Sequence, residues 1–275
     1  MKPGLLVFCL VFLNVHFLRA QESGNAASSV LFTKRTADSG ALVFPPRINF
    51  FRYSESSSKS LLYGFPESRI WGWSGNGKVA YSTEAFTDGR GGFVIEFIIF
   101  DLTSDRKLFE LRIDSYDHYN EESDNHNWDS FKNNSAAVED LYTLFSADIL
   151  NALRIHNIIA GQKTDFLSLP FRKNNMVYNS RIIAVEHRKD ESGLGLAFDD
   201  IVSRYTVLVT ADSKRKIIGN FNPVNSMTFH VYVCGYILSP FENRALLILA
   251  EEYWGFEGTE LAYRLSGCHL GVGFN

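Results

Sequence analysis

The stretch that decides the fold, residues 71–102, reads WGWSGNGKVAYSTEAFTDGRGGFVIEFIIFDL. Within it, residues 78–86 alternate in the way that is typical of a half-buried strand. Residues 93–100 are almost continuously apolar and rich in Phe and Ile, which favours a strand covered on both faces. The Asp-Gly-Arg-Gly-Gly segment at 88–92 supplies residues that accept positive φ. The stretch therefore predicts a β-hairpin.

The glycines of this stretch do not predict a phosphate site or a nucleophile. Gly89, Gly91 and Gly92 lack the dinucleotide-binding spacing and lie between two strands instead of opening a helix. Residues 72–76 resemble a nucleophile elbow, but Asn76 stands where the last glycine belongs and a strand follows where a helix is needed. We therefore interpret Ser74 as a turn residue.

Residues 1–20 have the features of an export signal. Lys2 provides a positive start, an apolar run covers residues 5–13, and Leu18-Arg19-Ala20 precedes a polar Gln21. Asn14 and His16 interrupt the run, which falls short of the roughly 20 apolar residues of a membrane span. We expect cleavage after Ala20 and an exported, periplasmic or secreted, soluble chain. Residues 21–275 then form one β-rich domain without a further membrane span.

Composition and charge narrow the class of protein. The chain is 45% apolar, which is enough for a proper core, and its formal net charge of -4 argues against a general nucleic-acid-binding protein. A short basic cluster, Lys214-Arg215-Lys216, is interpreted as a solvated turn.

The strand pattern of the opening stretch recurs twice. Ser213, Arg215 and Lys216 repeat Ser104, Arg106 and Lys107 at a shift of 109 positions. The segment 239–258 repeats the first hairpin at a shift of 166, which matches Lys78 with Arg244 and two glycines, Gly89 and Gly92, with Gly255 and Gly258. We therefore predict a mainly β fold of repeated β-meanders, with chance similarity among β-rich segments as the alternative.

Two of these segments resemble a known family. Residues 73–81 are similar to the S-x-x-G-K-x-A-Y opening of a blade in bacterial periplasmic β-propellers of the TolB type, and residues 101–108 to the D-L-x-x-x-x-K turn that closes such blades. The chain also resembles exported bacterial β-rich proteins that carry WGWS, DGRGG and C-terminal SPFENRALL segments, a group that implies no particular activity. The resemblance implies blade-like meanders. Three units are fewer than the usual four of a closed propeller, so an open, incomplete or sandwiched arrangement is equally expected.

One segment, residues 135–156, breaks the β pattern. Its apolar residues recur at helical spacing, acidic residues occupy the first turn, and Arg154 and His156 occupy the last. Ser146 divides the segment into two shorter helices in one interpretation. We predict a helical insertion that packs its apolar stripe against the sheets.

The acidic stretch 114–131 is dense in carboxylates and imidazoles, which are ligands of divalent cations. Asp124 and Asp129 are its weak candidate metal ligands. A calcium loop starting at Asp124 fails, because Asp129 replaces the required glycine and Ser135 the closing Glu. The histidines show no zinc spacing either. A polar connector is the preferred interpretation, and we expect no cofactor.

Carboxylates beside the repeated hairpins suggest a second class of function. If Glu84, Asp88, Glu251 and Glu252 converged in a pocket, two of them within about 10 Å would suit glycosidic acid–base chemistry in an envelope hydrolase. The alternative is that charges beside hairpins are hydrated and protect sheet edges.

Aromatic residues near turns favour binding over catalysis. Trp71 and Trp73 are expected to fill the core, whereas exposed loop aromatics serve recognition. The predicted binding residues are Trp254, Phe256, Trp128, Asp88 and Arg90. The preferred hypothesis is an exported, non-enzymatic protein that binds a protein partner or an envelope ligand through the loops of its meanders; a hydrolase and a metal-binding module are the alternatives.

Cys234 and Cys268 are the two cysteines left after signal cleavage, in a compartment that permits a disulfide. If a third strand separates their strands, their Cα atoms lie about 10 Å apart, beyond the roughly 7 Å that a bridge tolerates. If Cys268 instead follows the last strand, the chain can turn back. The sequence therefore leaves both a disulfide and two free thiols open.

Overall fold

The computed structural model describes residues 42–50, 66–86, 92–118, 135–162, 164–188, 201–255 and 258–275. All of them belong to one compact unit that extends from Asp38 to Asn275. This unit is mainly β, as predicted, with antiparallel sheets and two helices. The predicted signal at 1–20 lies outside the described residues.

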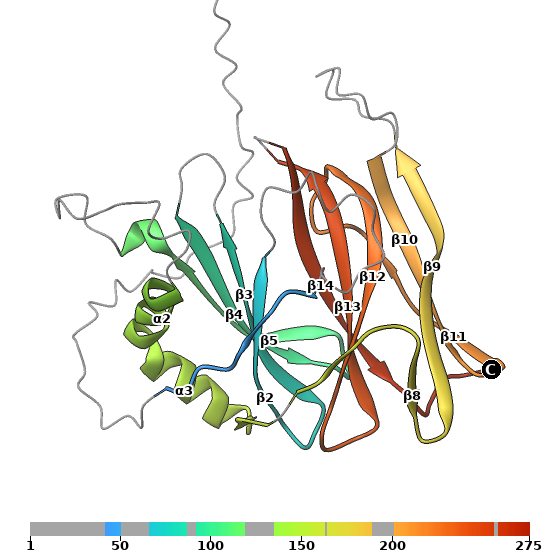
Figure 1. Ribbon diagram of the computed structural model, residues 1–275, viewed down its shortest axis with the longest axis horizontal. Coiled ribbons are helices and arrows are strands. Elements are labelled where there is room, and N and C mark those ends of the chain that lie inside the picture. The colour runs from blue at the N-terminus through green and yellow to red at the C-terminus, as the bar shows by residue number, and fades with distance from the viewer. Residues whose placement is uncertain are drawn as a thin grey trace, which may run out of the picture. The chain divides into compact units, whose positions relative to one another are not determined.

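The opening stretch forms the middle of a first sheet, sheet A (Figure 1). Its strand order is β1-β2-β3-β4-β5, with β6 paired to β2. The strands are β1 (Arg47–Ile48), β2 (Glu67–Trp73), β3 (Lys78–Phe86), β4 (Phe93–Asp101), β5 (Arg106–Asp114) and β6 (Ile159–Ala160). β3 and β4 pair antiparallel from Lys78–Asp101 to Phe86–Phe93, which confirms the predicted hairpin.

Two further meanders form two further sheets. Sheet C has the order β11-β10-β9-β8, and sheet B has the order β14-β13-β12-β7. The strands of sheet C are β8 (Phe171–Lys173), β9 (Met176–Arg188), β10 (Ile201–Ala211) and β11 (Lys214–Phe221). Those of sheet B are β7 (Phe166–Leu167), β12 (Thr228–Leu238), β13 (Arg244–Trp254) and β14 (Thr259–His269).

The predicted helical insertion is present as two helices, α2 (Ser135–Leu144) and α3 (Ser146–Ile155), and Ser146 begins the second of them. A short 3-10 turn, η2 (Ser115–Asp117), follows β5. The apolar stripe of the helices, including Leu141, Ile149 and Leu153, is buried against sheet A as predicted.

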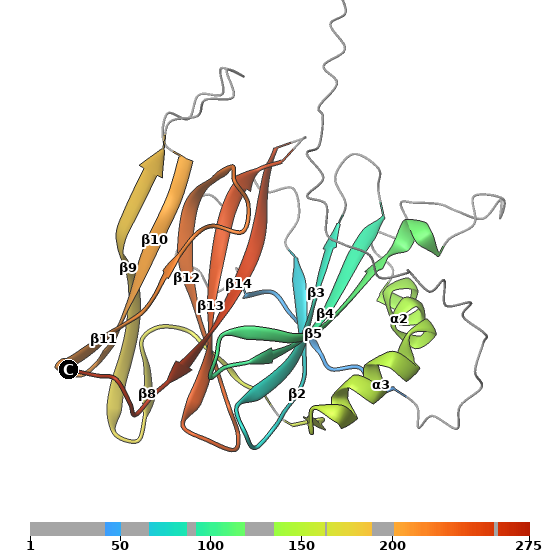
Figure 2. The ribbon, with the colours of Figure 1, turned by 180° about the vertical axis from the view of Figure 1, so that it is seen from behind.

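Three apolar cores lie between successive layers: the helices, sheet A, sheet B and sheet C (Figures 1 and 2). The helix–A core contains Trp71 and Phe97, the A–B core contains Trp73 and Ile98, and the B–C core contains Tyr205. Each tryptophan of β2 is at most 1% exposed, so both fill cores as expected. β4 is covered on both faces, which its continuous apolar sequence predicted.

Sheets A and B are built alike at β2 and β12. β2 and β12 each carry a bulge next to a glycine, Gly72 and Gly235. A Cβ on Gly72 would lie 2.2 Å from the Ile159 carbonyl oxygen, and one on Gly235 would lie 2.4 Å from that of Leu167. These are the sites where β6 and β7 approach, so the missing side chains let a two-residue strand pair with each sheet edge.

The predicted shift of 166 between the first and last meanders agrees with the starts of two strands but not with the core that their side chains enter. The strands start at equivalent positions, because Lys78 begins β3 and Arg244 begins β13. The side-chain faces, however, match at a shift of 167: Val79 and Leu246 both enter the A–B core. A one-residue change of register reverses every side chain of a strand, and residue type alone did not reveal it.

The basic cluster at 214–216 belongs to a strand and not to the predicted turn. Asp212 and Ser213 form the turn, and Lys214 is the first residue of β11. The pairs Thr210–Arg215 and Val209–Lys216 repeat the pairs Asp101–Arg106 and Phe100–Lys107 of sheet A at the predicted shift of 109.

Candidate functional site

Three of the hairpins end on the same side of the described unit. β3, β9 and β13 all run toward this end, at Phe86, Arg188 and Trp254 respectively (Figures 1 and 2). The turn between β12 and β13, which contains Phe241, lies at the opposite end of sheet B. Of the predicted binding residues the structure describes Trp254, which ends β13 at this side.

Aromatic and acidic side chains gather at this end of sheet B. We define the aromatic end as Phe229, His230, Tyr232, Glu252 and Trp254. The rings of Phe229 and Trp254 lie 5.8 Å apart at 33°, and those of His230 and Tyr232 lie 4.9 Å apart. The Tyr232 hydroxyl donates to the Glu252 carboxylate at 2.6 Å and lies 3.1 Å from Nδ1 of His230. The side chain of His230 is 64% exposed, whereas that of Glu252 is only 3% exposed.

A bulge in β12 creates this cluster. His230 is opposite Glu252 in the ladder, but the register shifts between Thr228 and His230. The bulge brings the rings of Phe229 and His230, which are adjacent in the sequence, to 6.4 Å. Period-two alternation cannot anticipate an extra residue, which explains why Phe229 was not among the predicted binding residues.

The loop of residues 222–227 is hydrogen-bonded to the backbone of the aromatic end. Trp254 N–H donates to the carbonyl of Met227, whose own N–H donates to Asn225 Oδ1 at 2.8 Å. Thr228 also donates to the carbonyl of Asn225. The backbone that carries Trp254 is therefore joined to the loop directly.

Glu251 holds this loop to sheets B and C. Its carboxylate, fully buried, accepts from the N–H of Val224 at 2.5 Å, from Nε of Arg264 at 2.7 Å and from the hydroxyl of Tyr205 at 2.6 Å. Arg264 in turn donates to the carbonyl of Asn222. Burial and the negative charge of Glu251 raise the pKa of Tyr205 well above its usual range, so this phenol stays protonated and donates.

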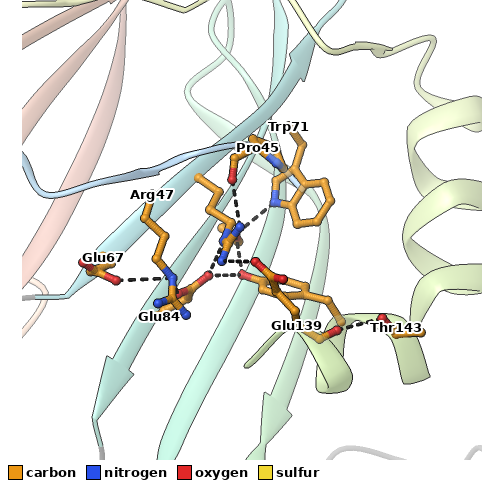
Figure 3. A network of polar contacts seen from close by, with 10 residues as sticks. Pro45, Arg47, Glu67, Trp71, Glu84, Glu139 and Thr143 are labelled. Carbon is orange, nitrogen blue, oxygen red and sulfur yellow. Dashed lines mark hydrogen bonds and ion pairs between the residues drawn. The ribbon is translucent and has the colours of Figure 1, made fainter. Parts of the chain in front are cut away.

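A second buried carboxylate, Glu84 of β3, occupies the helix-covered face of sheet A. It accepts from Nε of Arg69 at 2.6 Å, and Tyr142 of α2 lies 3.1 Å from the same oxygen (Figure 3). Arg47 approaches the other carboxylate oxygen at 2.7 Å. Two guanidinium groups therefore offset one buried negative charge.

Trp71 and Tyr142 are further hydrogen-bond donors in this second cluster, and Ser82 and Glu84 are the acceptors. Trp71 Nε1 donates to the Ser82 hydroxyl at 2.9 Å, and the Tyr142 hydroxyl lies 2.6 Å from the same Ser82 oxygen. The Tyr142 hydroxyl is the donor in both contacts, so its single hydrogen is shared between Ser82 Oγ and the Glu84 carboxylate. Burial and the charge of Glu84 raise the pKa of Tyr142, in agreement with a protonated donor. These contacts give the buried polar groups of Trp71, Ser82, Tyr142 and Glu84 hydrogen-bond partners within the cluster.

Three further groups bind the cations of this cluster at its rim (Figure 3). Arg69 donates to the carbonyl of Pro45 at 2.8 Å and lies 3.2 Å from Glu139 of α2. Arg47 lies 3.3 Å from Glu67. The cluster thus joins residues 45–47, two strands and a helix, and its groups are all engaged with one another.

The carboxylates of the hydrolase alternative do not form a shared site among the residues described. Glu84 faces the helices, Glu251 faces sheet C, and Glu252, its neighbour in β13, faces the opposite side of sheet B. Glu84 and Glu251 are each bound to an arginine and a tyrosine. Asp88, the fourth carboxylate, lies outside the described residues.

The remaining predicted site residues have mixed outcomes. Trp254 is half-buried and packs against Phe229. Phe256, Trp128, Asp88 and Arg90 lie outside the described residues, as do the metal candidates Asp124 and Asp129. Within the described ranges, no group of three or more His, Cys, Asp and Glu side chains is arranged to hold a metal ion. None of the helices described is long and apolar enough to cross a membrane.

Cys234 and Cys268 are both free and buried. β14 extends to His269, so Cys268 lies within that strand and β13 separates it from β12. Cys234 enters the A–B core and Cys268 the B–C core. The two thiols therefore lie on opposite faces of sheet B.

Comparison of the chain with protein-family models, curated protein sequences and solved structures finds no match.

Proposed function

We propose that the chain is an exported, non-enzymatic protein that binds a protein partner or an envelope ligand through the aromatic end of sheet B. The observation that carries the proposal is the juxtaposition of Phe229 and Trp254 with the exposed His230 over a buried Glu252. Amphipathic rings bury a large area at little entropic cost, and the imidazole adds a directional polar contact.

The rigid support beneath the aromatic end favours recognition. Glu251 holds the loop at Val224, and the loop holds the backbone of Trp254. A surface that is already fixed before binding loses less conformational entropy when the partner arrives. Export to the periplasm or the medium is supported by the signal-like residues 1–20.

Recovery of a partner from envelope extract tests this proposal without assuming a reaction. The mature chain serves as bait beside a variant with Phe229→Ala and Trp254→Ala. Aromatic residues at the centre of an interface typically contribute about 2 kcal/mol or more, so the double variant should recover its partner at least about tenfold less well.

Phe241→Ala is the matched control, because Phe241 is 42% exposed on the turn at the opposite end of sheet B. It should recover the same partner as the unchanged chain. Equal recovery by the double variant, with a melting temperature that shows it to be folded, would remove the aromatic end as the binding surface.

A further inference from the structure

Sheet C has one buried face and one solvent-facing face. Along β10, residues 205, 207, 209 and 211 are buried in the B–C core, whereas residues 204, 206, 208 and 210 alternate with them and are not. In Figures 1 and 2, sheet C is the last layer of the described unit on the side opposite the helices. Its solvent-facing side is therefore available for an interaction.

Each strand of sheet C contributes at least one arginine to this outer face, and four of them are considered as a set. The set comprises Arg172 of β8, Arg181 of β9, Arg204 of β10 and Arg215 of β11, all of them exposed. Their directions follow from the ladder: Arg181 pairs with Leu208, and Arg215 with Thr210, both on the outer side of β10. Arg172 lies between Phe171 and Lys173 and opposite Val177, so it points away from the buried Phe171. Adjacent strands are about 4.8 Å apart, so the arginines span a face roughly 15 Å wide.

This face is strongly basic although the whole chain has a net charge of -4. Glu186 is the acidic residue that the strands of sheet C place on it, 4.0 Å from Arg204. Four arginines and one glutamate give a formal charge of +3. Among the described residues, Arg172, Arg181 and Arg215 form no side-chain ion pair. Within the described ranges these three guanidinium groups have no acidic partner, and an external anion could bind them.

Strand geometry, and not sequence clustering, produces the patch. The side chains of the cluster Lys214-Arg215-Lys216 alternate between the two faces of β11. Lys216 points inward and donates to the carbonyls of His269 and Val272. Arg215 alone joins the outer face, beside arginines that are distant in sequence. A search for charge runs could not find this arrangement.

Apolar side chains lie among the arginines. Ile217, 63% exposed, is next to Leu208 in the ladder, and Leu208 is next to Arg181. Ile183, 43% exposed, is the extra residue of a bulge in β9. A soluble polyanion would gain nothing from these side chains, whereas the interface of a lipid bilayer takes up both apolar side chains and cations.

We propose that the outer face of sheet C binds the surface of an anionic phospholipid bilayer. The planar guanidinium groups offer paired N–H donors that match phosphate oxygens, which suits an all-arginine patch better than lysine would. Ile217 and Ile183 would enter the headgroup region between them. This interaction is independent of the aromatic end, so the two proposals can fail separately.

Co-sedimentation with vesicles tests the proposal. The full mature chain is mixed with vesicles of phosphatidylglycerol and phosphatidylcholine, or of phosphatidylcholine alone. Binding is expected to the anionic vesicles and to weaken with salt. Each juxtamembrane arginine contributes about fivefold to partitioning, so Arg181→Gln with Arg215→Gln should weaken binding about 25-fold. Glu186→Gln should strengthen it.

The matched control is Arg106→Gln with Arg112→Gln on β5, which removes the same charge from exposed positions of sheet A and should leave vesicle binding within about twofold. Equal losses in both double variants, or equal binding to uncharged vesicles, would overturn the proposal. Ile217→Ser should weaken vesicle binding and leave any binding to dextran sulfate unchanged. If the chain binds dextran sulfate through Arg181 and Arg215 but not the vesicles, the face recognises a soluble polyanion and the lipid proposal is wrong.

Discussion

The helix-covered face of sheet A and the sheet-covered face of sheet B each contain a buried glutamate that is bound by an arginine and a tyrosine. Glu84 binds Arg69 from its own sheet and Tyr142 from the covering helix. Glu251 binds Arg264 from its own sheet and Tyr205 from the covering strand. In both places a tyrosine of the outer layer donates to a carboxylate that an arginine neutralises. Each outer layer is thus fixed to its sheet at a defined position by a directional contact, which apolar packing alone does not provide.

The difference lies in what the second carboxylate oxygen holds. In Glu84 it faces another charged side chain, Arg47. In Glu251 it accepts from a backbone N–H, that of Val224, in the loop that supports Trp254. The first cluster therefore secures a layer, whereas the second also connects the interior to the candidate binding surface. Changes to matched residues of the two clusters separate these roles.

The largest effects are expected from removing the two carboxylate charges. Glu84→Gln leaves Arg69, which is 3% exposed, without its main counter-ion, and should lower the free energy of unfolding by about 4 kcal/mol. Glu251→Gln should cost about 3 kcal/mol, because the side chain of Arg264 is 25% exposed and water compensates part of the loss. Urea unfolding of each variant measures both values.

The contrary outcome is that Glu251→Gln lowers the free energy of unfolding more than Glu84→Gln does. The hydrogen bond between Glu251 and the loop would then contribute more than the burial of the arginine, and our ranking of the two substitutions would be wrong. A double variant provides the check of independence. The two clusters share no residue, so their costs should add within about 0.5 kcal/mol.

Intermediate effects are expected from the two tyrosines. Tyr142→Phe or Tyr205→Phe removes one hydrogen bond to a charged acceptor and should cost about 2 kcal/mol at neutral pH. Burial, followed by the charge of the nearby glutamate, raises the pKa of each phenol above that of an unfolded tyrosine, near 10. Their stabilisation is therefore complete below about pH 10 and is lost as pH rises above it.

Urea unfolding at about pH 8 and about pH 11 tests this linkage. Each Phe variant should lose less stability than the unchanged chain over that interval, because it has no phenol to titrate at that position. A parallel loss in variant and unchanged chain would show that the phenol is not protected by the fold.

The smallest signal is expected from the thiols, which report whether sheet B separates two cores. Burial raises the pKa of Cys234 to about 12, and burial also raises that of Cys268. The thiolate is the reactive form, so the folded mature chain should show almost no reaction with a thiol reagent. In urea without reductant both thiols should react. A chain that reacts only after reduction would contain a disulfide and would contradict the placement of Cys234 and Cys268 on opposite faces.

Local patterns predicted much of this fold. The expected element is present at each of three segments: the alternation at 78–86, the apolar run at 93–100 and the helical spacing at 135–156. Each prediction succeeds because the buried positions of one strand or helix recur along the sequence with the period of that element. The burial of Trp71 and Trp73 followed from the same reasoning.

The candidate site was less predictable because its contacts are not local. Arg69 meets Glu139 across 70 positions, and Tyr205 meets Glu251 across 46. The bulge at Phe229 and the one-residue change of face between β3 and β13 are invisible to an alternation pattern. Trp254 follows from the sequence as an aromatic residue near a predicted turn, whereas His230 and Tyr232 become candidates only through their contacts.

The central claim is that the end of sheet B is a binding surface held in place by Glu251. The most direct measurement is the recovery of a partner from envelope extract by Glu251→Gln and by Glu84→Gln, each at a temperature where the variant is fully folded. We expect Glu251→Gln to lose most of the partner, because Val224 and the loop below Trp254 lose their anchor, and Glu84→Gln to retain it. Equal recovery by the two variants would contradict this account.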